Sequence, residues 1–228
     1  MMAHTACSLV KRLCLLDPMD YKKFFFAQLK EDFIPLIRNL GFKGSGQNFR
    51  RIKNEIIHTI NIQGNKYGGS CCVNLGLHTT FLPLCWDSSK LPDFKTIKEV
   101  DCEFSLRLSP SGKHDYWWKY SGNGLLGNTS KSIIHLISTF NEVGQPYFDH
   151  YSSVESIIQE LSIENLSSSD YLNKLGRVVP IRGALTMARI YKYLGDKNKQ
   201  IEYAHWGLTN LGNATAIKEE LEQLANKT

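Results

Sequence analysis

Polar and apolar residues alternate along two neighbouring stretches of the chain. In Ile56–Gln63, one phase carries isoleucines and His58, and the other carries Ile57, Thr59, Asn61 and Gln63. The alternation breaks over Lys66–Gly69 and resumes from Cys71, with Val73, Leu75 and Leu77 on its apolar phase. A period of two is typical of half-buried strands. The pattern therefore predicts a hairpin with one apolar face and one polar face.

Further alternating stretches extend this hairpin into a larger sheet. Cys102, Phe104, Leu106 and Leu108 share one phase, whereas Asp101, Glu103, Ser105 and Arg107 share the other. Short connections between the first three strands favour an antiparallel order. The predicted strands are Asn48–Ile52, Ile56–Gln63, Cys71–His78, Cys102–Leu108 and Tyr116–Tyr120.

Helical periodicity flanks the predicted sheet on both sides. Asp17 and Pro18 are predicted to start a helix with an apolar stripe along one face, and Gly41 is predicted to end it. Pro35 lies within this helix and should kink or divide it. A second amphipathic helix begins at Asn128–Thr129 and is predicted to end near Gly144 and Pro146. It is the natural partner for the apolar face of the sheet.

The last part of the chain reads as helical. A short helix is predicted over Val154–Leu161, and a serine-rich joint at Ser167–Ser169 precedes helix-forming composition. The helices that follow resemble one pair of a tetratricopeptide-like array, but one pair cannot bury its own face. A packed helical appendage is therefore favoured over a peptide-binding groove. We predict an α+β main domain over residues 1–165, with an antiparallel sheet of about five strands backed by helices, and an all-helical extension over residues 166–228.

Composition and cysteine spacing narrow the class of protein. The 228 residues are 42% hydrophobic and carry a formal net charge of +5, which suits a globular chain with a mildly basic surface. The six cysteines form no CxxC pair, so they are expected to be reduced thiols that pack in a core.

The amino-terminal stretch does not read as a targeting or membrane segment. Lys11 and Arg12 interrupt its apolar run, and nowhere in the chain does an apolar run approach the roughly 20 residues of a membrane span. A cytoplasmic protein without a membrane partner is expected, and delivery by a secretion system that reads no amino-terminal signal stays open.

The sequence lacks the common motifs that carry enzyme chemistry. It contains no HExxH, HxH, GxSxG, P-loop or Rossmann glycine pattern, and Gly41–Gly46 reads as a turn because a helix precedes it. The seven histidines are dispersed, and structural roles are favoured for each, with His58 the one most worth testing. We therefore expect no cofactor, no metal and no catalytic residue.

The polar phase of the sheet is the strongest candidate surface. Its amides, its tryptophan and its charges of both signs match a protein recognition surface better than a phosphate track. The alternative is an ordinary solvated sheet face, and a phase error of one residue would exchange the two faces. Thr59 lies on this phase, and the candidate binding residues are Arg50, Asn61, Gln63, Asn74, His78, Glu103, Arg107, Trp117 and Lys119.

Several of these segments together resemble a known bacterial family. The carriers are the segment Leu40–Lys43, Gly46 with Phe49–Arg51, Ile60–Gln63, Cys72–Gly76 and Tyr116–Trp118. In this order, over about residues 20–150, they are similar to the domain of unknown function DUF4304. The resemblance implies an α+β fold and brings no established activity. Immunity or defence roles are common among small bacterial α+β proteins, and by that analogy they are expected here.

Two function classes follow from these observations. The first is a non-enzymatic protein-binding module, of an immunity or effector-inhibiting type, that uses the polar sheet face. The second is a small hydrolase or nucleic-acid-acting protein whose site is assembled from remote residues, beginning with His58, His78, Glu103 and Arg107. A nucleic-acid partner is less favoured than a protein, because the charge excess is small and no recognised motif accompanies the candidate basic and aromatic residues. Those residues are Arg50, Arg51, Lys53, Lys66, Tyr67 and Trp117.

Overall fold

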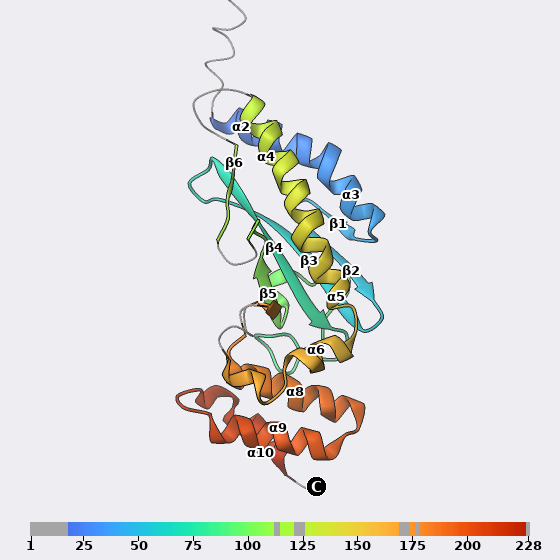
Figure 1. The fold of residues 1–228 in the computed structure, drawn as a ribbon, viewed down its shortest axis with the longest axis vertical. Coiled ribbons are helices and arrows are strands. Elements are labelled where there is room, and N and C mark those ends of the chain that lie inside the picture. The colour runs from blue at the N-terminus through green and yellow to red at the C-terminus, as the bar shows by residue number, and fades with distance from the viewer. Residues whose placement is uncertain (1–17, 112–114, 121–125, 169–173, 177, 227–228) are drawn as a thin grey trace, which may run out of the picture. The chain divides into compact units, whose positions relative to one another are not determined.

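The computed structural model describes residues 18–111, 115–120, 126–168, 174–176 and 178–226 (Figure 1). The chain forms two compact units, each assembled from segments distant in sequence. The first unit comprises the described residues of Met1–Phe49, Asn61–Asn74 and Arg107–Tyr147. The second comprises the described residues of Arg50–Ile60, Leu75–Leu106 and Phe148–Thr228. The predicted domain boundary near residue 165 stays a prediction.

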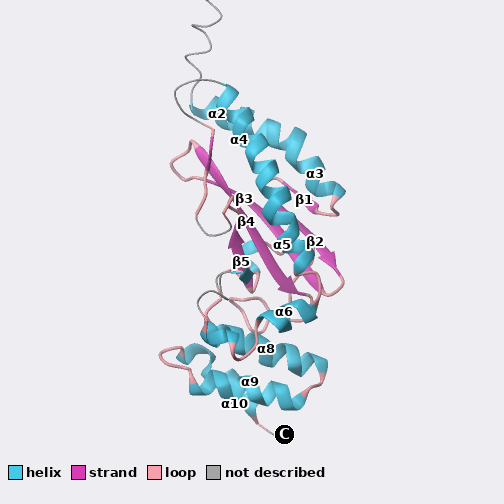
Figure 2. Cartoon of the chain, viewed as in Figure 1, coloured by secondary structure: helices cyan, strands magenta, loops and turns pink. Residues whose placement is uncertain are grey.

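Six strands in the described part of the chain form one sheet with the order β1-β2-β3-β4-β5 (Figure 2). Strand β6 pairs with β4 in antiparallel register, with Ser70 opposite Lys119 and Cys71 opposite Trp118. The predicted α+β class with an antiparallel sheet is confirmed. The strands are β1 (Lys43–Ser45), β2 (Asn48–Lys53), β3 (Ile56–Gly64), β4 (Ser70–Thr79), β5 (Phe104–Arg107) and β6 (Trp118–Lys119).

The first helical segment of the first unit is divided by a π-helical turn. Helix α2 (Pro18–Gln28) passes into η1 (Leu29–Phe33) and then α3 (Ile34–Asn39). Pro35 lies in the first turn of α3, so the wider turn precedes the residue that cannot donate a backbone hydrogen bond. The division expected at Pro35 therefore takes the form of a π-helical turn.

The second long helical segment repeats this arrangement. Helix α4 (Leu126–Thr139) is followed by the π-helical turn η3 (Phe140–Gly144) and by α5 (Gln145–His150). The predicted end near Gly144 and Pro146 is wrong, because after the π-helical turn Pro146 falls in the first turn of α5, where a missing N–H is tolerated. In the first unit α4 lies beside α2 and contacts β6 (Figure 1).

In the second unit both faces of the sheet are covered. On one face, Ile57 joins a buried cluster with Leu84, Ile97 and Cys102, and the Thr59 hydroxyl lies 3.4 Å from the Cys102 sulfur. These partners come from the segment between β4 and β5, which contains the short 3₁₀ helix η2 (Glu99–Asp101). The interpretation of one polar, solvent-facing sheet side is therefore wrong for this unit.

The opposite face of the second unit is packed by aromatic rings. The His58 ring lies 4.7 Å from that of Phe148. All the residues of β4 within this unit are buried, from Leu75 to Thr79. The predicted phase of Cys102 is also wrong: the strand begins only at Phe104, and the preceding 3₁₀ helix turns Cys102 toward Thr59.

The remaining helices of the second unit follow one another along the last third of the chain. They are α6 (Val154–Glu160), η4 (Asn165–Ser167), α8 (Pro180–Leu194), α9 (Lys197–Thr209), η5 (Thr215–Ile217) and α10 (Lys218–Ala225). Gly195, in the left-handed conformation, ends α8, and the Asp196 side chain caps α9 by accepting from the Lys199 N–H. A Cβ on Gly207 would lie 3.0 Å from Leu221, so α9 and α10 approach closely there.

Candidate functional site

A row of polar side chains crosses the strands of the first unit. The Asn61 amide on β3 donates to Asn48 Oδ1 on β2 at 2.8 Å, and the Asn74 amide on β4 donates to Asn61 Oδ1 at 3.3 Å. Arg107, at the end of β5, donates from Nε to Asn74 Oδ1 at 3.0 Å. These four residues, which we call the amide row, lie on the same phase of successive antiparallel strands, so their side chains meet across the sheet.

Gln63 forms hydrogen bonds with two members of the amide row. Its Oε1 accepts from Asn74 Nδ2 at 3.0 Å and from Arg107 Nη2 at 3.4 Å. The Cys72 thiol lies 3.6 Å from the same oxygen. Asn74 is only 6% exposed, so these partners satisfy an amide that would be costly to bury unpaired.

The row ends in an arginine that is held from several sides. The Arg107 guanidinium forms an ion pair with Asp115 and lies 5.2 Å from the centroid of the Trp117 ring. Trp117 Nε1 donates to Asp115 at 3.2 Å. The Arg107 side chain is 24% exposed and that of Asp115 is 56% exposed, so this end of the row faces solvent.

The amide row and the side chains that contact it, Gln63, Asp115 and Trp117, form one cluster in the first unit. Five of the predicted binding residues meet in this cluster: Asn61, Gln63, Asn74, Arg107 and Trp117. Lys119 is exposed on β6, two residues beyond Trp117 and on the same strand phase. The other three, Arg50, His78 and Glu103, belong to the second unit.

Sequence reasoning missed two members of the cluster, Asn48 and Asp115. Asn48, Asn61 and Asn74 recur at equal intervals along the chain, which is a signal that successive hairpin strands carry them in register. Asp115 shares the alternation phase of Trp117, which could also have been read from the sequence.

In the second unit, Glu103 is the centre of a buried ionic cluster. Arg182 on α8 donates to Glu103 from Nε at 2.7 Å and from Nη2 at 3.0 Å. The Thr186 hydroxyl donates to the same carboxylate at 2.7 Å, and Arg182 Nη2 also reaches the Cys85 carbonyl at 2.7 Å. The Glu103 side chain is only 2% exposed, so its charge is compensated inside the fold.

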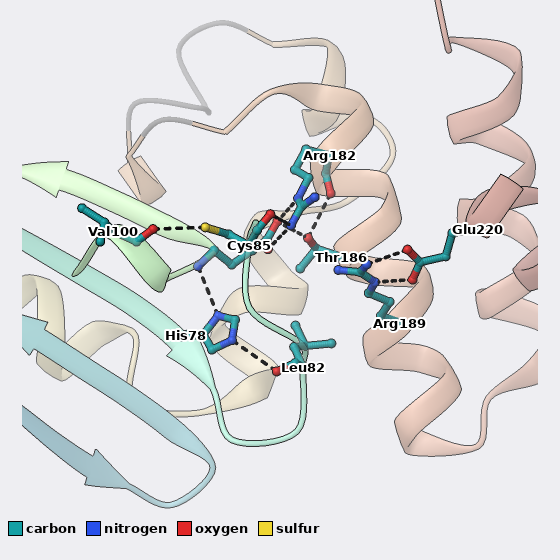
Figure 3. Close-up of polar contacts among 9 residues, drawn as sticks. His78, Leu82, Cys85, Val100, Arg182, Thr186, Arg189 and Glu220 are labelled. Atoms are coloured by element: carbon teal, nitrogen blue, oxygen red, sulfur yellow. Dashed lines mark hydrogen bonds and ion pairs between the residues drawn. The ribbon is translucent and has the colours of Figure 1, made fainter. Parts of the chain in front are cut away.

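His78 is a neutral structural residue beside this cluster. Its Nδ1 accepts from the Glu103 backbone N–H at 3.1 Å, so its Nε2 carries the proton and donates to the Leu82 carbonyl at 3.2 Å (Figure 3). Burial lowers the pKa of His78 below its ordinary value.

His58 is engaged in a similar way. Arg51 Nε donates to its Nδ1 at 3.0 Å, and its Nε2 donates to the Tyr151 carbonyl at 2.7 Å. Burial lowers the pKa of His58 to about 4. Both ring nitrogens are thus already in use, as they are in His78, so neither histidine offers a free base.

Burial holds two of the thiols in the described residues in their neutral form. Cys71, Cys72, Cys85 and Cys102 are free cysteines. Burial raises the pKa of Cys71 to about 12 and raises the pKa of Cys102 further, which disfavours the thiolate. Cys7 and Cys14 lie outside the described residues. No group of three or more metal-ligating side chains was found among the residues that the structure describes.

The basic residues that could bind nucleic acid already have partners within the fold. Arg51 and Lys53 lie 3.7 and 4.0 Å from the Asp149 carboxylate, and Arg50 donates to the Lys95 carbonyl. Lys66 lies 4.7 Å from the centroid of the Tyr67 ring.

The class of protein is defined by an antiparallel sheet with flanking helices and a polar side-chain row on its strands. Residues 33–167 match the model of the family described as Domain of unknown function (DUF4304), and the chain belongs to this family. No curated protein and no solved structure matches the chain. No helix in the described ranges is long and apolar enough to cross a membrane.

Proposed function

We propose that the chain is a non-enzymatic binding module that recognises another protein through the amide row and Trp117. The observation that carries this proposal is that Arg107 is held in one orientation and is still partly exposed to solvent. Its guanidinium is oriented by Asn74, Gln63 and Asp115, lies near the Trp117 ring, and remains in part open to solvent.

Such an arrangement suits recognition for energetic reasons. Tryptophan and arginine dominate the binding energy of many interfaces, and a side chain that is already ordered loses little entropy when a partner binds. Gln63 Nε2 and Asn48 Nδ2 make no hydrogen bond within the described residues, so both can donate to a partner. Exposed Lys119 would extend the same surface along β6.

The narrower role that we propose is a bacterial, cytoplasmic protein of the immunity or effector-inhibiting type. It rests on analogy with other small α+β proteins. For the hydrolase alternative, the contacts of His58 and His78 offer no support, because hydrogen bonds within the fold use both nitrogens of each ring.

The test is a comparison of two tryptophan variants. Trp86 is a matched control, because it also donates to an aspartate, Asp101 at 2.8 Å, and has a cation, that of Lys90, 5.8 Å from its ring centroid. Tagged wild-type, Trp117→Ala and Trp86→Ala proteins would be used to capture partners from native-cell lysate, with detection by mass spectrometry.

We expect a stoichiometric protein partner that Trp86→Ala retains and Trp117→Ala loses, with similar melting temperatures for both variants. For the purified partner, loss of Trp117 should weaken binding by about 2 kcal/mol, roughly thirtyfold. A partner that both variants bind as wild type does would remove the amide row from the interface. Recovery of nucleic acid alone would contradict the proposed class of partner.

A further inference from the structure

The first unit also contains an open groove of about 890 Å³, separate from the amide row. One wall is the segment α2–η1–α3, and the other is formed by the hairpin of β1 and β2 together with Ile62 of β3. Ile62 lies on the opposite strand phase to Asn61 and Gln63, so the groove opens on the other face of the sheet from the amide row.

The floor of the groove is apolar. It is lined by Phe26, Leu29, Ile34, Pro35, Phe49 and Ile62. Leu29, Phe49 and Ile62 are almost fully buried, whereas Pro35 is exposed and Phe26 and Ile34 are half-buried. Grooves of roughly 300 to 1,000 Å³ with such a lining accommodate small organic ligands.

The rim of the groove is positively charged. Lys22, Lys30 and Arg38 line it, and none of the described lining residues is acidic. The three cations recur at equal intervals of eight residues, and all three face the groove.

The three cations differ in what holds them. Arg38 Nη2 donates to the Gly44 carbonyl at 3.0 Å, which places its charge over the hairpin. Lys22 and Lys30 are exposed and form no ion pair within the described part of the chain, so they can pair with an incoming anion.

The π-helical turn η1 contributes Leu29 and Lys30 to this wall. Single π-helical turns inside α-helices occur frequently at functional sites. Here the turn places an apolar floor residue directly beside a rim cation.

We propose that this groove binds a small amphipathic carboxylate, with its apolar body on the floor and its anionic head between the rim cations. The charge of the rim selects an anion, and the apolar floor requires more than a charged group. Neither a bare anion nor an amphipathic cation satisfies both parts of the groove.

The experiment is a calorimetric titration of the full chain with dodecanoate, at concentrations below those at which dodecanoate forms micelles. Dodecyltrimethylammonium supplies the same tail with the opposite charge, and acetate supplies the head without the tail. We expect saturable one-to-one binding of dodecanoate, with either control ligand at least about tenfold weaker.

Two readouts place the bound ligand. In isoleucine-methyl spectra, Ile34 and Ile62 should shift with dodecanoate, and Ile57 in the second unit should not. The double variant Lys22→Gln/Lys30→Gln should bind about tenfold more weakly. Lys131→Gln, which removes an exposed cation from α4 outside the groove, should bind as wild type does.

Three results would overturn the proposal. They are no saturable binding of dodecanoate, equal binding of dodecanoate and dodecyltrimethylammonium, and an equal loss of affinity in the double variant and in Lys131→Gln. Melting curves of each variant separate a loss of binding from a loss of folding. Because the groove shares no residue with the amide row, its failure leaves the proposed protein-binding function untouched.

Discussion

The polar phase of the strands reaches solvent in the first unit and is buried in the second. In the first unit it carries the amide row, which reaches solvent through Arg107 and Asp115. In the second unit the same phase carries Thr59 and His78, both of which are buried. Alternation in a sequence thus identifies which side chains share a face of a strand, but not what covers that face.

The difference is also one of electrostatics. The Arg107–Asp115 pair of the first unit is open to water, which screens it, whereas the Glu103 carboxylate of the second unit is buried beside Arg182. Exposed pairs stabilise folds little, but removing one partner of a buried pair leaves an uncompensated charge. The two ion pairs therefore predict very different responses to mutation.

The largest effect should come from breaking the buried pair. Glu103→Ala removes the carboxylate that compensates the Arg182 charge and accepts from Thr186, and it should lower the free energy of unfolding by about 4 kcal/mol. Asp115→Ala in the exposed pair should lower it by less than about 1 kcal/mol. Urea unfolding of both variants measures the contrast, and similar losses would mean that the two pairs do not differ as their burial indicates.

A second effect is the pH dependence that His58 gives to the second unit. The pKa of His58 is about 4 in the fold and 6.5 in the unfolded chain, with Arg51, Lys53 and Asp149 as its charged neighbours. Between these values the unfolded chain binds more protons, so stability must fall as the pH falls from 6.5 toward 4. The loss from this group should be on the order of 3 kcal/mol.

Urea unfolding between pH 4 and pH 7 would measure this dependence. The loss toward pH 4 should shrink in His58→Gln and stay unchanged in His205→Gln, which replaces an exposed histidine of α9. The side chains of Asn48, Asn61, Asn74 and Gln63 do not titrate, so none of the four contributes to this dependence. An unchanged pH slope in His58→Gln would show that His58 is not the source.

Two strand glycines give a smaller and sharper contrast. A Cβ on Gly76 would lie 2.2 Å from the Thr59 hydroxyl and 2.9 Å from the Cys102 sulfur, whereas the nearest atom to a Cβ on Gly64, Gln47 Nε2, is 4.0 Å away. Gly76→Ala should therefore cost about 2 kcal/mol of stability by overpacking. Gly64→Ala should be neutral or slightly stabilising, and thermal melts that showed equal losses would argue against a covered face at Gly76.

The smallest effect should follow from shortening the amide row. Asn61→Ala removes one acceptor of the Asn74 amide and leaves the other, Gln63 Oε1, in place. The expected loss is about 1 kcal/mol, against a loss within about 0.5 kcal/mol for Lys119→Ala on the exposed part of β6. Loss of the folded state in Asn61→Ala would contradict this estimate.

Much of the fold could be predicted from periodicity. The predicted strands Asn48–Ile52, Ile56–Gln63 and Cys71–His78 differ from β2, β3 and β4 by one residue at most at either end. Trp118 and Tyr120, which lie on the alternation phase opposite to Trp117, are buried.

The rest depended on packing that has no local pattern. Leu84 and Ile97 are isolated apolar residues in a largely polar segment, so nothing in their spacing indicates that they cover Ile57. The π-helical turns were missed because a proline predicts a break and not its geometry. The partner of Glu103 lies on α8, and no local signal connects residues so distant in sequence.

The amide row also bears on how the strands find their alignment. A hairpin that slips by two residues keeps every apolar side chain on its proper face, so hydrophobic alternation alone cannot reject that error. In this chain a slip between β3 and β4 that moves Asn61 and Gln63 away from Asn74 would leave a buried amide without its acceptors. The side chains proposed to recognise a partner would thus also favour the correct strand register during folding.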